Sequence, residues 1–181
     1  MRKAIFAIMI CFGLTAPAVA DQTDPRLDLL FEELRTGEAG RAEENVARIM
    51  EIWATSSSDT VNLLYERALQ SRAAGENGLA DALLDHVVGL APNFAQGYAL
   101  RGAIRLDSND QVGAIEDFSK VLELEPRQFE VRQTLAELLL ANGEKYEAYV
   151  MYQKVLEWNP HSDSARRVAR ELRREIDGQE I

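Results

Sequence analysis

The sequence predicts an all-α fold of stacked helical hairpins, and three observations lead to this prediction. Three prolines stand 34 residues apart along the chain, namely Pro92, Pro126 and Pro160. The segments that they close align without a gap and carry like residues at like positions: 61–94, 95–128 and 129–162. Apolar residues also recur at helical spacing on either side of these segments. A fixed period of this length is typical of a solenoid built from one repeated unit.

Two columns of this alignment hold only small residues. They are the eighth and twentieth positions of each segment, occupied by Ala68, Gly102, Ala136, Ala80, Ala114 and Ala148. Small side chains let the backbones of two packed helices approach closely. Each segment is therefore predicted to be a hairpin of two helices in close contact.

Two further columns mark the turn and the space between hairpins. The fifteenth position holds residues that adopt positive φ at little cost and so end the first helix: Gly75, Asn109 and Gly143. The twenty-fourth position holds large apolar residues, predicted to fill the space against the next hairpin: Leu84, Phe118 and Tyr152. The proline then stops the second helix.

These columns resemble those of the tetratricopeptide repeat family, whose unit is a helix, turn and helix of 34 residues. The resemblance implies a right-handed α-solenoid of antiparallel helix pairs, with three repeats over 61–162. Some positions depart from the family pattern, because the seventh is usually Leu and is Arg67 and Arg101 in the first two repeats. We interpret such departures as changes in packing detail and not in fold.

The resemblance also implies a concave groove lined by the first helices of successive repeats. In this family, side chains at positions two, five, six, nine and twelve point into the groove. The matching residues are Asn62, Tyr65, Glu66, Leu69, Arg72, Gln96, Ala99, Leu100, Ala103, Leu106, Glu130, Gln133, Thr134, Glu137 and Leu140. The centre of this set is apolar and its flanks are polar, which suits an extended or helical peptide.

One subclass of the family binds a C-terminal carboxylate through Lys, Asn and Arg at set groove positions. This chain carries other residues there, namely Tyr65, Leu69, Glu130 and Thr134. Capture of a chaperone tail is therefore disfavoured.

Two arginines stand out on the first helix of the second repeat. Arg101 and Arg105 are one turn apart, at positions where the family usually has apolar residues. One interpretation is that they extend between hairpins and pair with acids such as Glu137. The other is that they form a spot that recognises an anion.

Residues 1–20 have the pattern of a secretory leader: a basic start, an apolar run over 4–15 and an A-x-A site at 18–20. Cleavage is expected after Ala20. The run is shorter than the roughly 20 apolar residues that span a bilayer, so no stable membrane insertion is expected after cleavage. Cys11, the only cysteine, lies in the leader. The leader and the resemblance to short periplasmic repeat proteins of alphaproteobacteria together predict a periplasmic protein.

The segments that flank the repeats are predicted to cover their two ends. Residues 21–60 read as a degenerate leading helical pair that covers the bare face of the first repeat. Residues 163–181 read as a capping helix and tail, with one face apolar and arginines on the other. The helix is interpreted as a solvated cap, or alternatively as a basic docking face for an anionic partner or membrane.

The composition and motifs favour a binding protein over an enzyme. The formal net charge of −10 disfavours nucleic acid as a partner. No nucleophile, metal or phosphate-binding motif occurs, so no catalytic, cofactor or metal residue is predicted. The expected function is a periplasmic adaptor or scaffold that binds a protein or peptide through its groove. The alternatives are an accessory subunit of an envelope biogenesis enzyme system, for cytochromes, cell wall or polysaccharide, and a protein with an unrecognised catalytic site. The sequence contains no feature that specifies an oligomeric state.

Overall fold

The structure is a computed structural model that describes residues 23–179. The predicted leader and its cleavage site lie outside these residues. In chain order, the helices of the described part are α1 Arg26–Thr36, the short 3₁₀ helix η2 Ala39–Arg41, α2 Ala42–Trp53, α3 Asp59–Ala73, α4 Asn77–Leu90, α5 Ala95–Asp107, α6 Gln111–Leu124, α7 Phe129–Ala141, α8 Lys145–Trp158 and α9 Asp163–Gln179. None of these helices is long and apolar enough to cross a lipid bilayer.

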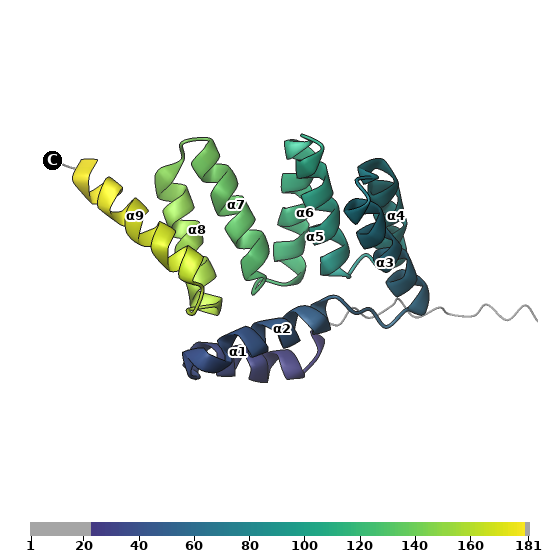
Figure 1. Ribbon diagram of the computed structural model, residues 1–181, viewed down its shortest axis with the longest axis horizontal. Helices are drawn as coiled ribbons and strands as arrows, with labels where there is room; N and C mark the ends of the chain where they lie inside the picture. The colour runs from purple at the N-terminus through teal and green to yellow at the C-terminus, as the bar shows by residue number, and fades with distance from the viewer. Residues whose placement is uncertain (1–22, 180–181) are drawn as a thin grey trace, which may run out of the picture.

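The three predicted repeats form three helical hairpins, α3–α4, α5–α6 and α7–α8. Figure 1 shows them standing side by side in a row, with α9 after the last of them. The all-α, right-handed solenoid predicted from the sequence is confirmed. The capping helix is also found, because α9 packs on α8 and buries Ala165, Ala169 and Leu172.

The alignment columns have the physical roles that the sequence predicted. Gly75, Asn109 and Gly143 adopt φ of 79°, 61° and 83°, each at the turn inside a hairpin. At the eighth position, a Cβ added to Gly102 would lie 2.7 Å from the ring of Phe118. The small residue therefore lets α6 seat its large side chain directly against α5.

One substitution made at two glycines is expected to have opposite effects on stability. At Gly143, Gly→Ala should lower the free energy of unfolding by about 1 kcal/mol, since φ is positive and a Cβ is strained there although nothing lies within 4 Å. At Gly89, exposed within α4, Gly→Ala should raise it by about 0.5 kcal/mol through helix propensity. Urea denaturation of both variants checks the pair, and equal signs would contradict the backbone assignment.

The leading pair does not lie where the sequence placed it. The prediction that α1 and α2 cover the first repeat is wrong: their apolar side chains share a core with α7, α8 and α9. In Figure 1 the pair lies crosswise beneath the row of hairpins, at the ends of α7 and α8. The chain thus folds back along the solenoid before the first repeat begins.

Aromatic side chains explain this position. The ring of Phe31 lies 5.7 Å from that of Trp53 within the pair, and 6.4 Å and 5.7 Å from those of Phe129 and Trp158 in the third repeat. Such tilted and edge-on contacts contribute beyond the apolar area that they bury. The third repeat presents the two large rings of Phe129 and Trp158 to the leading pair at this edge, and α1 and α2 share their core with it.

Polar contacts fix the same interface at its rim. The guanidinium of Arg127, in the loop before α7, lies 4.7 Å above the ring of Phe31 and 2.7 Å from the carboxylate of Asp28. The indole Nε1 of Trp53 donates to buried Glu125 at 3.3 Å. The α6–α7 loop is therefore held by the leading pair, which steadies the start of α7.

Candidate functional site

A groove crosses the first helices of the three repeats, α3, α5 and α7, and encloses a hollow of about 280 Å³. Most of the residues predicted from the sequence line it: Tyr65, Leu69, Arg72, Gln96, Ala99, Leu100, Ala103, Glu130 and Thr134. Its floor is apolar, because it is formed by Ala99 and Leu100, which are nearly buried. The small side chain of Ala103 leaves room above them. The hollow thus has Ala99 and Leu100 at its floor and polar side chains along its walls.

Six of the predicted groove residues do not line this hollow: Asn62, Glu66, Leu106, Gln133, Glu137 and Leu140. The amide of Asn62 donates to the Ser56 carbonyl and accepts from its N–H, both at 2.8 Å, so it secures the loop before α3. Gln133 donates to Glu137 at 3.1 Å and accepts from Ser164 in α9 at 3.5 Å. Leu106 and Leu140, named with them, pack instead as partly buried core residues.

Three residues line the hollow that the sequence did not place there: Phe118, Gln128 and Val131. Phe118 belongs to α6, behind the groove wall, and its ring reaches the floor because Gly102 has no side chain to block it. Gln128 caps α7, since its side-chain oxygen accepts from the N–H of Glu130 at 3.1 Å. Phe118 could have been predicted from the sequence, because each repeat pairs a small residue at the eighth position with a large one at the twenty-fourth. No comparable pattern indicated Gln128.

Polar side chains of Tyr65, Gln96 and Gln128 line one wall of the groove. The side-chain oxygen of Gln96 accepts a hydrogen bond from Gln128 at 3.3 Å. Burial raises the pKa of Tyr65 to about 12, and its ring packs edge-on against Phe94 at 5.4 Å. Tyr65 therefore stays a neutral hydrogen-bonding group at physiological pH, and the wall presents fixed amide and phenol groups to a ligand.

The two charged residues of the groove differ in their partners. Arg72 donates to the carboxylate of Asp107 at 2.8 Å and 3.1 Å, so its charge is already balanced across α3 and α5. The carboxylate of Glu130 makes no hydrogen bond or ion pair with the residues described, and the groove wall around it raises its pKa through desolvation. Glu130 is therefore the charge that an incoming group of opposite sign would satisfy.

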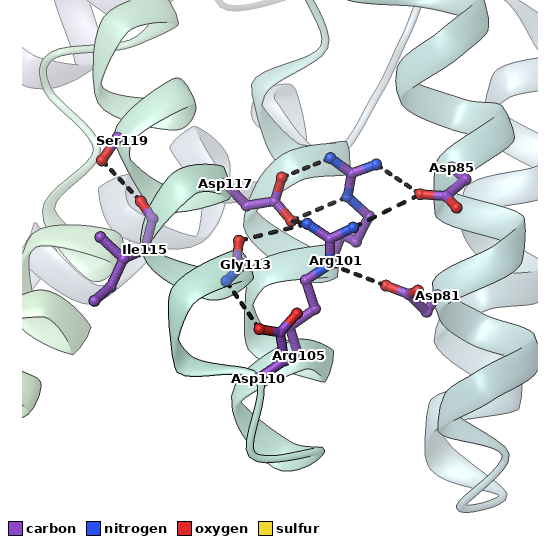
Figure 2. A network of polar contacts seen from close by, with 9 residues as sticks. All are labelled: Asp81, Asp85, Arg101, Arg105, Asp110, Gly113, Ile115, Asp117 and Ser119. Carbon is purple, nitrogen blue, oxygen red and sulfur yellow. Dashed lines mark hydrogen bonds and ion pairs between the residues drawn. The ribbon is translucent and has the colours of Figure 1, made fainter.

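The arginine pair on α5 is fully engaged within the protein. Figure 2 shows the guanidinium groups of Arg101 and Arg105 between Asp117 on one side and Asp81 and Asp85 on the other. Asp117 accepts from Arg101 at 2.6 Å and 3.0 Å and from Arg105 at 2.9 Å, and only 4% of its side chain is exposed. The hydrogen bonds that Arg101 donates to Asp117, and then to Asp85, raise the pKa of Arg101.

This cluster decides between the two interpretations of the arginine pair. They pair with acids between hairpins, as one interpretation held, but the acids are Asp81, Asp85 and Asp117 and not Glu137. The cluster joins α4, α5 and α6 and leaves no charge for an external anion. Its role is to bind the first two repeats together.

No group of three or more His, Cys, Asp or Glu side chains in residues 23–179 is placed to hold a metal ion. The groove combines an apolar floor, neutral hydrogen-bonding groups and the carboxylate of Glu130.

Comparison with known proteins agrees with the fold. A family model described as tetratricopeptide repeat matches residues 105–172. A TPR repeat-containing protein of Rhizobium etli is 26% identical over 154 residues, which cover 84% of this chain and 76% of that protein.

Two solved structures with similar folds hold peptides. The Yersinia enterocolitica type III secretion chaperone SycD, in complex with a peptide of the translocator YopD, has a TM-score of 0.56 and 20% identity, over 67% of this chain and 92% of that one. The first TPR domain of Spaghetti (RPAP3), bound to an HSP90 peptide, has a TM-score of 0.60 and 17% identity, over 66% and 98%. At these identities the likeness shows the fold.

Proposed function

Since this chain belongs to the tetratricopeptide repeat family, whose fold is that of a protein-interaction scaffold, we propose that it is a non-catalytic adaptor of the bacterial periplasm. It binds a segment of a partner protein in the groove of α3, α5 and α7. The observation that carries this proposal is the hollow itself, where most of the sequence-predicted groove residues converge on an apolar floor. Peptides bound by two similarly folded proteins support it.

The groove favours a partner segment that carries a cation. Its unpaired charge is the carboxylate of Glu130, while Arg72 is balanced by Asp107. A lysine or arginine next to Glu130 would pair with this exposed carboxylate, while apolar side chains of the segment pack over Leu69 and Ala103. A segment rich in acids would meet repulsion at the same place. We therefore expect an apolar segment with a basic residue.

Site-specific photo-crosslinking in cells tests where the partner binds. A photoreactive residue at Leu69, on the groove and 42% exposed, is expected to trap the partner. The matched control is the same residue at Val112, which is 72% exposed on α6 and does not line the groove. Ala103→Trp, which fills the trough, should abolish the Leu69 crosslink. Equal crosslinks from both positions, or a crosslink that survives Ala103→Trp, would refute the groove as the binding site.

The charge of the groove gives a quantitative prediction for the trapped partner. A peptide from the crosslinked segment should bind Glu130→Lys about tenfold more weakly than the wild type, because one attractive pair becomes a repulsive one. Glu137→Lys changes the charge by the same amount on the same helix but outside the hollow, so affinity should change less than twofold. Isothermal titration calorimetry measures both. Equal losses of affinity in the two variants would show that the net charge of the protein, and not the position of Glu130 in the groove, determines binding.

The proposed location has its own test. Fractionation of cells that express the full chain should recover a protein shortened at Ala20 in the periplasmic fraction. Recovery of uncut protein in the cytoplasm would refute the location and leave the groove proposal standing. If the crosslinked partner is an enzyme of envelope biogenesis, the chain acts as its accessory subunit; a structural envelope protein identifies a scaffold.

A further inference from the structure

A second hollow, of about 540 Å³, lies between α8 and α9 on the C-terminal flank of the repeats. Its lining from α8 is Tyr149, Gln153 and Leu156, and its lining from α9 is Arg166, Ala169, Arg170, Arg173 and Arg174. Four of these side chains are cationic and none is acidic, in a chain whose formal net charge is −10. This local concentration of positive charge runs against the charge of the whole molecule.

Two of the four arginines have partners and two have none in the described residues. Arg166 pairs with Asp163 at 2.6 Å, and Arg173 pairs with Asp177 at 3.1 Å and donates to the Tyr149 hydroxyl at 3.4 Å. Arg170 and Arg174, one turn apart on α9, make no hydrogen bond or ion pair with residues 23–179. They are available to an external anion.

The repeat frame shows what kind of ligand this cleft accepts. Counted from Asp163, α9 continues the 34-residue frame as the first helix of a further unit, which puts Arg170 in the eighth position. In the second repeat the eighth residue, Gly102, faces Asp117 and Phe118 of the helix that completes the hairpin. The α8–α9 cleft is thus the place where a completing helix packs, and no described helix occupies it.

The α5–α6 hairpin also shows how such a helix is held. Arg105 occupies the eleventh position of its repeat, and it binds Asp117 of the completing helix at 2.9 Å. Arg173 occupies the same position of α9, and Arg170 and Arg174 flank it. Arg170 stands where the other repeats have a small residue, so an incoming helix meets guanidinium groups there instead of a close backbone contact.

We propose that the α8–α9 cleft binds an acidic amphipathic helix of a partner protein, which lies on the side of α9 that corresponds to the side of α5 where α6 lies, but farther from the backbone of α9 because Arg170 intervenes. Its carboxylates pair with Arg170 and Arg174, and its apolar face covers Leu156 and Ala169. A helix is favoured over an anionic membrane as the ligand, because the cleft continues the repeat frame, in which a helix packs at this place.

The test uses the full chain and a synthetic helical peptide of Glu, Leu and Ala, matched to α6 in its length of 14 residues. Fluorescence anisotropy should show binding of this peptide and much weaker binding of the same peptide with Gln in place of Glu. Arg170→Ala with Arg174→Ala should weaken binding about tenfold, because two charge pairs are lost. The loss should shrink as salt is raised.

The matched control is Arg67→Ala with Arg167→Ala, which removes two exposed arginines that do not line the cleft. Its affinity should stay within about twofold of the wild type, and circular dichroism should show unchanged helicity in both double variants. Three results would overturn the proposal: no binding of the acidic peptide by the wild type, equal weakening in both double variants, or binding of vesicles containing anionic lipid through Arg170 and Arg174 without binding of the peptide.

Discussion

Phe118→Asp is expected to lower the free energy of unfolding by about 4 kcal/mol or more and to leave most of the repeat array unfolded. The ring is 2% exposed and shares a core with Ala95, Ala114 and Val121. An aspartate there would place a charge in this apolar core against Gly102 and would open a cavity between α5 and α6. Thermal and urea denaturation followed by circular dichroism measure the loss.

The control for this variant is Ile115→Asp, one turn earlier on α6. Ile115 is 41% exposed, so the same side chain at this position stays hydrated and should change stability by about 0.5 kcal/mol or less. Equal stability losses in the two variants would mean that helix propensity or net charge, and not burial, sets the effect. A Phe118→Asp protein that melts near the wild type would show that the second hairpin does not depend on this contact.

The repeats were predictable because each of their features depends on residues close in sequence. A positive φ at Gly75, Asn109 and Gly143 and a small residue at the eighth position act within one hairpin, and the period repeats the evidence three times. Neighbouring hairpins then stack because their exposed apolar faces are alike. The fold therefore followed from the alignment of the three segments alone.

The groove was predictable in its centre and less so at its edges. Backbone position places Tyr65 and Leu100 in the hollow, since every first helix presents the same face. Side-chain partners decide the rest: the amide of Asn62 binds the loop at Ser56, and Gln133 turns to Ser164 of α9. Such hydrogen bonds join residues that no repeat pattern relates, so the sequence did not indicate them.

The position of the leading pair was not predictable for the same reason. Its contacts join residues about a hundred positions apart, such as Phe31 with Phe129, and no period links them. The sequence indicated that residues 21–60 form amphipathic helices. The apolar face of such helices must be covered by another part of the protein. The surface that covers the apolar face of the leading pair is formed by rings such as Phe129 and Trp158, which come together only in the folded third repeat.

Phe31→Ala is expected to detach the leading pair while the three repeats stay folded. Phe31 is 2% exposed and its ring contacts Trp53, Phe129 and Trp158, so its loss should cost about 3 kcal/mol or more of local stability. The stacking of the Arg127 guanidinium on this ring is lost as well. Hydrogen exchange should then accelerate across residues 26–53 and stay slow across the buried parts of 61–162, because the two regions open separately.

Leu29→Ala is the control for this undocking, since Leu29 lies on the same helix and is 63% exposed. It should leave exchange in residues 26–53 as slow as in the wild type, because it removes no contact with the third repeat. If Phe31→Ala instead accelerates exchange evenly along the chain, the leading pair and the repeats unfold as one unit. If it changes nothing, the aromatic cluster is not what holds α1 and α2 beneath α7 and α8, and the polar contacts of Arg127 and Glu125 must carry the interface.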